Sequence, residues 1–328
     1  MAKKLRIGFI GAGGISHGHY HRLHETRKAQ VVALNEPSKK AVERFHERCP
    51  GSDALPLYRD YKEMLRKEDL DGVVILSPHT LHYEQIMTSL GKGLHVLTEK
   101  PMVCTIRRAK ALIRKAKSAK RVLMISYQRH FDPQFRYMRE QIAKGKLGKI
   151  EYVQAIQCQG WLHGTRGTWR QKMALSGGGQ LNDSGSHLID IVMWVTGMKV
   201  SEVFSKQENF RREVDINSTL AMAFENGALG SMSVIGNAAG WHEDHTIVGS
   251  KGAFYLRQGL GLTQKDANGK EVKIKLPKYT KNPDSNFVDS ILGKDVPQTP
   301  PECGLRTIEV TEAAWKSAAS GKPVKVPK

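Results

Sequence analysis

The stretch Ile7–Ser16, which reads IGFIGAGGIS, constrains the fold of this chain more than any other. An apolar run typical of a buried strand ends in the pattern G-x-G-x-x-S, formed by Gly11, Gly13 and Ser16, and a helical pattern follows. In such a strand–turn–helix unit the first glycine permits a tight turn and the second lets the backbone approach a pyrophosphate. The helix N-terminus offers N–H groups and its positive dipole end to the phosphates. The motif therefore predicts a dinucleotide-binding site.

The expected cofactor contacts extend beyond the two glycines. The helix should begin near Gly14 and Ile15, which places both residues beside the phosphates. An acidic residue about 20 positions further on typically binds the adenosine ribose, and Glu36 follows the second strand pattern. Its carboxylate should accept hydrogen bonds from the ribose diol and repel a 2′-phosphate, which favours NAD. The Ser-Lys-Lys run at 38–40 could bind that phosphate, so NADP stays possible.

Strand and helix patterns alternate through the first part of the chain. Helical patterns of ten to fifteen residues separate the apolar runs, which lie at 5–13, 30–38, 71–78, 94–101 and 121–128. This alternation predicts parallel strands joined by right-handed helical crossovers. We therefore expect an α/β fold, a doubly wound Rossmann domain, over residues 1–125.

The pattern changes after residue 126. Strand segments with turn glycines and asparagines follow one another at 149–160, 200–210, 218–236, 245–257 and 271–277. A long helical segment, 184–197, interrupts them and another, 304–321, closes the chain. Alternating strands of this kind indicate an antiparallel sheet. We predict a C-terminal α+β domain over residues 126–328 with a large open antiparallel sheet.

The formal net charge of +19 raises the question of a nucleic-acid or membrane partner. Residues 101–150 hold 14 Lys or Arg against Asp132 and Glu140. Many of them lie in 105–121, where apolar residues recur at helical spacing and no aromatic residues are interleaved for base stacking. We expect the solvent-exposed face of an amphipathic helix, with a polyanion site as the less favoured alternative.

Other partners are predicted to be absent. The N-terminal segment lacks the apolar core of a secretory signal, and no stretch is long enough to span a membrane. The four cysteines are scattered without metal-binding spacing, and no two-histidine-plus-carboxylate cluster at helical spacing argues for a metal. These features favour a cytoplasmic protein without a metal site.

Polar residues follow two strand patterns of the first domain. Ligands of open parallel sheets bind beyond the carboxyl ends of the strands, so these residues are cofactor candidates. They are Ser77, Pro78, His79, His82, Glu99 and Lys100. Lys100 could be a cation beside the nicotinamide or a surface lysine before a turn proline. Its bond to Pro101 is a candidate for the cis form.

The segment LNDSGSHLID, residues 181–190, carries Asp183, His187 and Asp190 at helical spacing, on one helix face. In one interpretation Asp183 caps the helix, His187 lies in the core and Asp190 faces solvent. In the other, the face serves the oxidation of a secondary alcohol, which needs a base and a hydride acceptor and benefits from a cation near the oxygen. His187 would then be the base, Asp183 would orient it or the substrate hydroxyl, and Lys100 would lower the pKa of that hydroxyl.

The chain resembles the glucose–fructose oxidoreductase/inositol dehydrogenase (Gfo/Idh/MocA) family over nearly its full length. The resemblance rests on the segments GAGGIS, SPHTLH, GLHVLTEKP, YQRHFDP, GTWRQ and SGGGQLNDSGSHLIDIVMWVTG, and continues through VGSKGAFYL to NFVDSI and SAASGKPV. It implies a Rossmann domain, tightly held NAD(P), and a second domain whose open sheet commonly mediates dimers or tetramers.

The resemblance also implies roles for individual residues. Lys100, Asp183 and His187 match the family's catalytic set, which acts on hydroxyls of sugars and cyclitols. Trp169 and Arg170 match a pair near nicotinamide and substrate, and Gln128 in YQRH is a further cofactor candidate. The role of His130 in YQRH is left open by the family pattern.

Several aromatic and basic residues in turn-rich segments could line a sugar pocket, because a Trp with His and Arg suits stacking on a sugar ring and bonding of its hydroxyls. The substrate candidates are His163 and Arg166, with Trp241, His242 and His245 as weaker ones. Trp161 and Trp194 are expected in the core.

The favoured prediction is an NAD-dependent oxidoreductase that transfers a hydride from a secondary hydroxyl of a sugar, cyclitol or sugar derivative to nicotinamide. One alternative is glycoside cleavage through transient oxidation at C3 and elimination. A second is a non-catalytic regulator that senses NAD or a sugar on the same fold. Retention of Lys100, Asp183 and His187 argues against the regulator.

Overall fold

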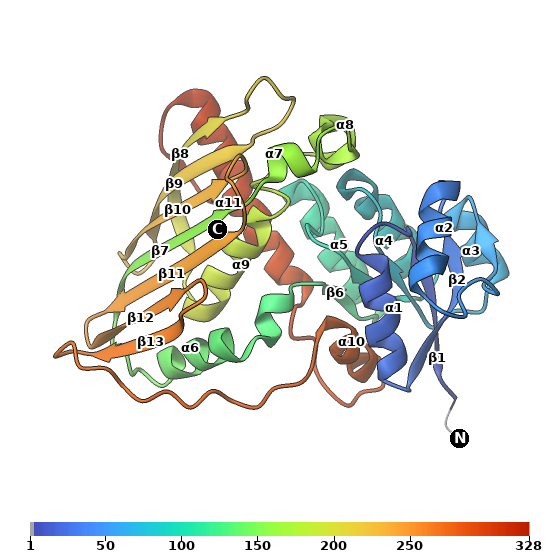
Figure 1. The fold of residues 1–328 in the computed structure, drawn as a ribbon, viewed down its shortest axis with the longest axis horizontal. Helices are drawn as coiled ribbons and strands as arrows, with labels where there is room; N and C mark the ends of the chain where they lie inside the picture. The colour runs from blue at the N-terminus through green and yellow to red at the C-terminus, as the bar shows by residue number, and fades with distance from the viewer. Residues whose placement is uncertain (1–2, 328) are drawn as a thin grey trace. The chain divides into compact units, whose positions relative to one another are not determined.

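The computed structural model describes residues 3–327, which divide into two compact units (Figure 1). The first unit comprises the chain up to Val103 with residues 107–128 and 281–304. The second comprises residues 104–106, 129–280 and the chain from Leu305 onward.

The first unit is built on a six-stranded sheet in the order β3-β2-β1-β4-β5-β6, with every pairing parallel. Its strands are β1 (Leu5–Ile10), β2 (Ala29–Asn35), β3 (Leu57–Tyr58), β4 (Gly72–Ile75), β5 (His95–Thr98) and β6 (Leu123–Ile125). The helices between them are α1 (Ser16–Glu25), α2 (Lys39–Arg48), α3 (Tyr61–Lys67), α4 (His82–Gly91) and α5 (Ile106–Ala119). The predicted Rossmann fold is confirmed.

The basic segment forms α5 and is amphipathic as predicted. Ala109, Leu112 and Ala116 are buried, whereas every exposed position of α5 except Ser118 is basic, among them Arg107 and Lys110. The cations therefore meet water while the apolar stripe packs inward. Among the described residues no helix combines the length and apolarity that crossing a membrane requires.

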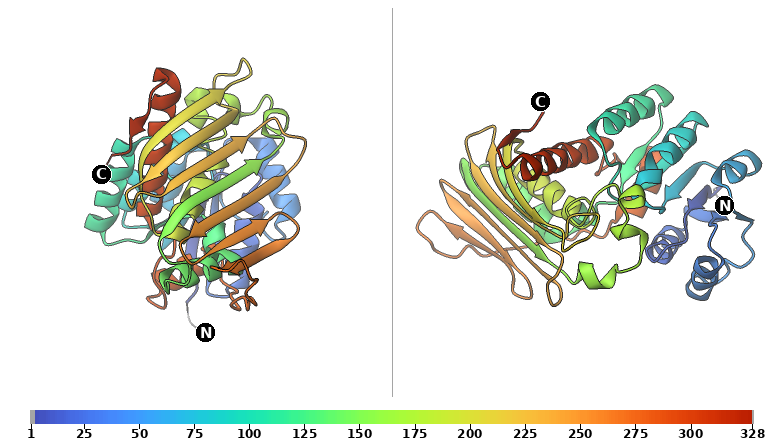
Figure 2. Two further views of the ribbon diagram at one scale, coloured as in Figure 1. Left: turned by 90° about the vertical axis from the view of Figure 1, so that its left-hand side faces the viewer. Right: turned by 90° about the horizontal axis from the view of Figure 1, so that it is seen from above.

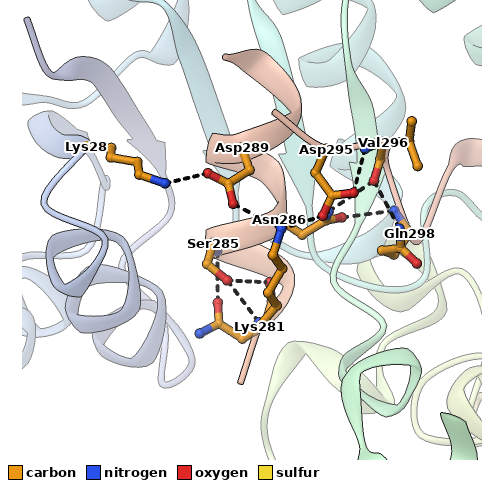
Figure 3. A network of polar contacts seen from close by, with 9 residues as sticks. Lys28, Lys281, Ser285, Asn286, Asp289, Asp295, Val296 and Gln298 are labelled. Atoms are coloured by element: carbon orange, nitrogen blue, oxygen red, sulfur yellow. Dashed lines mark hydrogen bonds and ion pairs between the residues drawn. The ribbon is translucent and has the colours of Figure 1, made fainter. Parts of the chain in front are cut away.

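Residues 281–304 return to the first unit, which departs from the single boundary expected at residue 125. This segment contains α10 (Pro283–Ile291), whose Phe287 and Val288 are fully buried in the same apolar core as Phe9. Charged groups reinforce the packing, since Asp289 accepts from Lys28 at 2.7 Å and bridges to Lys281 at 3.1 Å (Figure 3). A boundary read along the chain cannot show such a return.

The second unit is built on an eight-stranded sheet in the order β13-β12-β11-β7-β10-β9-β8-β14. Its strands are β7 (Ile150–Cys158), β8 (Val200–Glu208), β9 (Asn217–Phe224), β10 (Leu229–Ile235), β11 (His242–Gly249), β12 (Gly252–Arg257), β13 (Gly261–Asp266) and β14 (Val324–Lys325). The predicted open sheet is present, but it is mixed, because β10 runs parallel to β7.

One predicted strand of this sheet is wrong. Residues 271–277 alternate apolar and charged side chains, yet only Glu271 forms an isolated bridge, with Lys265. The last full strand on this edge is β13, at 261–266. The alternating pattern did not produce a strand because a strand also needs a partner edge along its length.

The helices of the second unit that cover its sheet are α6 (Pro133–Ala143), α9 (Gly185–Thr196) and α11 (Pro301–Ser320), all on one face (Figures 1 and 2). The described residues of this unit place no helix on the opposite face, which is turned to the viewer in the left panel of Figure 2. Helix α9 is buried along nearly all of its length, and its Leu188, Ile191 and Val192 belong to the main core. The residues that precede α9 are thereby fixed on a rigid element.

Candidate active site

The glycine turn of the first unit is shaped for a close approach by a ligand. Gly11 has a φ of +104°, and a Cβ there would lie 2.9 Å from the carbonyl carbon of Leu76, so only glycine fits. The carbonyl of Gly13 accepts from the backbone N–H and the hydroxyl of Ser16. The N-cap residue of α1 is Ile15, whose side chain makes no capping hydrogen bond, and the first turn of the helix contains no acidic residue. The helix start therefore keeps its positive end for an anion.

Glu36 joins this turn to the end of β2. One carboxylate oxygen accepts from the backbone N–H of Ala12 at 2.8 Å, and the other accepts from that of Ser38 at 2.9 Å. The carboxylate is thus held beside the glycine turn, half-buried, at the position where a ribose diol is expected.

A small cavity of about 70 Å³ adjoins the turn, and the sequence analysis did not single out its cations. Besides the backbone of Gly13 and Gly14, it is lined by His17, Arg44 and Arg48. Burial and the neighbouring Arg48 lower the pKa of His17. The two arginines lie four residues apart on α2, so they share one face of that helix. The sequence shows this spacing, but only the packing of α1 beside α2 shows that the shared face lines the cavity. Open backbone N–H groups and two guanidiniums fit the phosphates of a dinucleotide.

The residues after β4 form a rigid turn. The ring of His82 is fully buried, with Nδ1 2.9 Å from the carbonyl of Pro101 and Nε2 2.9 Å from that of Ser77. Burial lowers the pKa of His82. Both ring nitrogens therefore face backbone carbonyls, which gives His82 the role of tying two turns together rather than contacting a ligand. His79, in the 3₁₀ turn His79–Leu81, is buried beside it.

The turn after β5 carries Lys100, whose backbone N–H donates to Oε2 of Glu99 at 3.2 Å. The Lys100–Pro101 bond is cis. Lys100 itself is half-buried and Glu99 is 8% exposed. Gln128, at the start of the 3₁₀ turn Gln128–Phe131, donates to the Ser126 hydroxyl at 3.3 Å.

Asp183 is the most firmly held carboxylate of the second unit's candidate residues. It is 3% exposed, and its Oδ2 accepts from Trp161 Nε1 at 2.9 Å and from Arg170 Nε at 3.0 Å. The guanidinium of Arg170 lies over the ring of Trp169, 4.6 Å from its centroid. Trp161 is core, as predicted, but it also positions Asp183. The interpretation of Asp183 as a helix cap is wrong, since Ser184 holds the N-cap position.

His187 and Asp190 have different surroundings although they share a helix. His187 lies in the first turn of α9 and is half-buried. Asp190 is 2% exposed and binds Nε2 of His130 at 2.6 Å, so its interpretation as a solvent-facing residue is wrong. His130 stacks on the ring of Trp194 at 4.3 Å between centroids. This buried pair accounts for both residues and joins α9 to the 3₁₀ turn at 128–131.

The loop 177–182 that leads to Asp183 is held by Asp215, which the sequence analysis missed. The Asp215 carboxylate accepts from the backbone N–H groups of Gly179 and Leu181 and from Trp315 Nε1, at 2.8–3.0 Å. Burial raises the pKa of Asp215 although these donors oppose the change. A Cβ on Gly179 would lie 1.8 Å from the Asp215 carbonyl oxygen. Gly179 is therefore required by packing.

The weaker candidates of the second unit are dispersed. His163, Arg166 and Trp241 are exposed, and His242 begins β11. His245 does not lie in a loop: it is a buried residue of β11, 3.0 Å from Glu243 and edge-on to Phe135. Its placement in a sugar pocket is therefore wrong.

The second unit also contains a cavity of about 610 Å³ that none of the predicted site residues lines. Its walls include Trp315, Met173 and three carboxylates, those of Glu208, Glu213 and Asp215. The cavity thus borders Asp215, which holds loop 177–182, and does not border Asp183.

Within each unit, the structure brings predicted residues together. In the first, the Glu36 carboxylate binds the turn that contains Gly11 and Gly13, and the Glu99 carboxylate accepts from the backbone N–H of Lys100. In the second, Asp183, Trp169 and Arg170 form one cluster next to the start of α9, which carries His187.

Both units resemble known proteins of the same family. Residues 5–127 match the family model described as oxidoreductase family, NAD-binding Rossmann fold, and residues 135–255 match the GFO/IDH/MocA C-terminal domain. The chain is 27% identical over 196 residues to the rhizopine catabolism protein MocA of Rhizobium meliloti, covering 60% of this chain and 58% of MocA. It is 29% identical over 199 residues to the D-glucoside 3-dehydrogenase of Escherichia coli (strain K12), covering 59% and 54%. The chain spans a little over half the length of these two curated relatives.

The fold has full-length counterparts among solved structures. The aldose-aldose oxidoreductase from Caulobacter crescentus, complexed with glycerol, superimposes with a TM-score of 0.85 and 24% identity over 98% of this chain and 100% of that chain. The two family models, matched in their expected order, show that the chain belongs to the Gfo/Idh/MocA family of oxidoreductases.

Proposed function

We propose that the protein is an NAD-dependent oxidoreductase that oxidises a secondary hydroxyl of a sugar, cyclitol or sugar derivative. The observation that carries this proposal is the buried Asp183 carboxylate, held by Trp161 and Arg170 just before the helix start that carries His187. A buried carboxylate bound by two donors is a fixed acceptor of the kind that orients a hydroxyl or an imidazole. The NAD-binding Rossmann domain of the same chain supplies the second half of a dehydrogenase.

The proposed chemistry assigns one role to each residue. NAD, when bound, accepts the hydride from the carbinol carbon. His187 takes the hydroxyl proton, so that the products are a ketone, NADH and a proton. Lys100 stabilises the negative charge that develops on the hydroxyl oxygen as its proton leaves, and Asp183 orients His187 or the hydroxyl. Trp169 and Arg170 contact the nicotinamide and the substrate, and His163 and Arg166 contact the sugar.

NAD is the proposed cofactor, with NADP as the second choice. The Glu36 carboxylate, fixed by Ala12 and Ser38, favours a ribose diol over a 2′-phosphate. We assign cofactor contacts to the glycine turn and to the turns after β4, β5 and β6. The residues are Gly11, Gly13, Gly14, Ile15, Ser77, Pro78, His79, Glu99, Lys100 and Gln128.

The name of one relative favours a second candidate function. The E. coli relative is named a D-glucoside 3-dehydrogenase, and oxidation at C3 is the first step of glycoside cleavage by elimination. Release of an aglycone without net formation of NADH would support cleavage. Formation of one NADH for each intact glycoside would exclude it.

Self-association and location complete the proposal. The uncovered face of the eight-stranded sheet supports a homodimer or homotetramer, as the family resemblance implies. Cys49, Cys104 and Cys303 are buried and Cys158 is half-buried, and no disulfide joins these four, all of which the structure describes. This favours a reducing compartment, the cytoplasm.

The test is the absorbance at 340 nm of purified protein with NAD and a panel of free sugars, inositols, sugar acids, sugar phosphates and glycosides. We expect a rise with one substrate class. His187→Ala should lower kcat by about 10²- to 10⁴-fold while NAD still binds, because a positioned general base contributes that much. His21→Ala, at an exposed histidine, is the matched control. Near-normal turnover of His187→Ala would remove His187 from the role of base.

A further inference from the structure

His19 lies on α1 with its ring completely buried between two carboxylates from distant parts of the first unit. Its Nδ1 is 2.6 Å from Oδ1 of Asp284 on α10, and its Nε2 is 3.1 Å from Oε1 of Glu99 after β5. Asp284 in turn accepts from Nε of Arg22 at 2.5 Å. The cluster therefore contains two carboxylates, one guanidinium and one imidazole.

The two contacts favour a positively charged ring. A neutral imidazole carries one N–H, so it can donate to only one carboxylate and turns a lone pair toward the other. The imidazolium donates to both. Burial lowers the pKa of His19, but the charges and hydrogen bonds of Asp284 and Glu99 outweigh it and raise the pKa to about 9. At neutral pH the four groups then sum to zero charge, as a buried cluster requires.

The cluster ends at the backbone of Lys100. Glu99 uses one oxygen for His19 and the other for the N–H of Lys100, so its carboxylate is held from both sides. Helix α1 begins at the glycine turn, and Lys100 follows β5. The buried ring of His19 thereby connects α1, which follows the glycine turn, to Lys100, which follows β5. No local spacing in the sequence indicates this connection, since His19 and Asp284 are 265 residues apart.

We propose that His19 is a positively charged positioning residue that fixes the Glu99 carboxylate and, through it, the backbone at Lys100. The inference rests on the proposed function only in taking Lys100 to act on the substrate. It assigns no ligand contact to His19, whose ring has no exposed atom surface.

The charge is tested on the unaltered protein. Long-range ¹H–¹⁵N correlation spectra of its imidazoles distinguish imidazolium from neutral rings, and the His19 signal is identified by its absence in His19→Gln. We expect two protonated ring nitrogens at pH 7, and loss of the charge only as the pH rises through about 9. A neutral His19 at pH 7 would overturn the proposal.

The positioning role is tested by two neutral variants that each keep one donor. The amide nitrogen of His19→Gln replaces Nε2 and can still donate to Glu99, whereas that of His19→Asn replaces Nδ1 and can donate only to Asp284. We expect the Lys100 amide to exchange its hydrogen about tenfold faster in His19→Asn than in His19→Gln, because Glu99 loses its second support. Equal exchange rates of the Lys100 amide hydrogen in the two variants would contradict the proposal.

Binding and turnover separate this inference from the proposed function. The dissociation constant for NAD, measured by fluorescence titration, should agree within about threefold between the two variants, while kcat should fall about 100-fold in His19→Asn, a loss typical of a misplaced group. Lys100→Met is the reference. If Lys100→Met turns over normally, the proposed role of Lys100 fails, whatever the charge of His19. If Lys100→Met is inactive but the two His19 variants are equal, only the positioning role fails.

Discussion

The Glu36 carboxylate accepts hydrogen bonds from two backbone N–H groups and lies beside the glycine turn, where a ribose is expected. Glu36→Ala should raise the Kd for NAD about tenfold or more, because a charge-assisted hydrogen bond to the diol is lost. The Kd for NADP should change less or fall, since the repulsion of its 2′-phosphate disappears and Arg44 and Arg48 remain nearby. Fluorescence titration with both cofactors measures the ratio.

The matched control for this change is Glu43→Ala, which removes an exposed carboxylate from the middle of α2. It should leave both dissociation constants unchanged. Tighter binding of NADP than of NAD by the unaltered protein would contradict the assignment of Glu36.

Residues whose role depends on neighbours in the sequence were predictable, and residues whose role depends on the fold were not. Gly11 and Glu36 follow from a motif in which strand, turn and helix are consecutive. His19 and Asp215 carry no such signal, because their partners come from segments that are brought near only by packing. Asp190 is a further example. Its spacing predicts that it shares a helix face with His187, but its burial against His130 follows only from the fold.

Among the elements, the loop 177–182 joins the packing of the second unit to its candidate chemistry. Gly179→Ala would place a Cβ 1.8 Å from the Asp215 carbonyl oxygen, a backbone atom that cannot turn away. The loop must then move, and Asp183 with it. We expect a loss of about 3 kcal/mol in the free energy of unfolding, at the upper end of overpacking costs. Turnover should fall about 100-fold while the Kd for NAD stays unchanged.

Gly164→Ala is the control for this substitution, because a Cβ there meets nothing within 4 Å. Thermal unfolding followed by circular dichroism and the 340 nm assay are measured on both variants. A Gly179→Ala protein with unaltered melting temperature and turnover would show that the contact is relieved without displacing Asp183.

The elements themselves were predicted with uneven success for a physical reason. The helices at 39–48 and 106–119 carry their own apolar stripe, so their existence follows from local spacing. A strand depends on a neighbour, and residues 271–277 alternate correctly but pair with β13 only at their start, where Glu271 bridges to Lys265 and the N–H of Val272 donates to the carbonyl of Gln264. The parallel pairing of β7 with β10 is equally invisible in the chain, because it follows from the path of the segment between them.

At the scale of the whole molecule, the uncovered face of the eight-stranded sheet contrasts with the net charge of +19. On its three central strands, β7 from Tyr152 on, β9 and β10, none of the outward-pointing residues is charged. They are Tyr152, Gln154, Ile156, Cys158, Asn217, Thr219, Ala221, Ala223, Leu229, Ser231, Ser233 and Ile235. Leu229 is 61% exposed within the single chain. An uncharged strip across three neighbouring strands of an open sheet face, on a strongly charged protein, favours an interface between subunits.

This contrast leads to a prediction about assembly. Ala221 lies at the centre of the face, between Phe204 on β8 and Ser231 on β10, and its side chain is exposed. Ala221→Glu would bury an unpaired carboxylate in a dimer that uses this face, which costs several kcal/mol. Sedimentation velocity should show the unaltered protein as a dimer or tetramer and Ala221→Glu shifted toward the monomer. Ala54→Glu, at an exposed turn of the first unit, should keep the assembly intact. If Ala221→Glu also keeps it, the subunits associate through another surface.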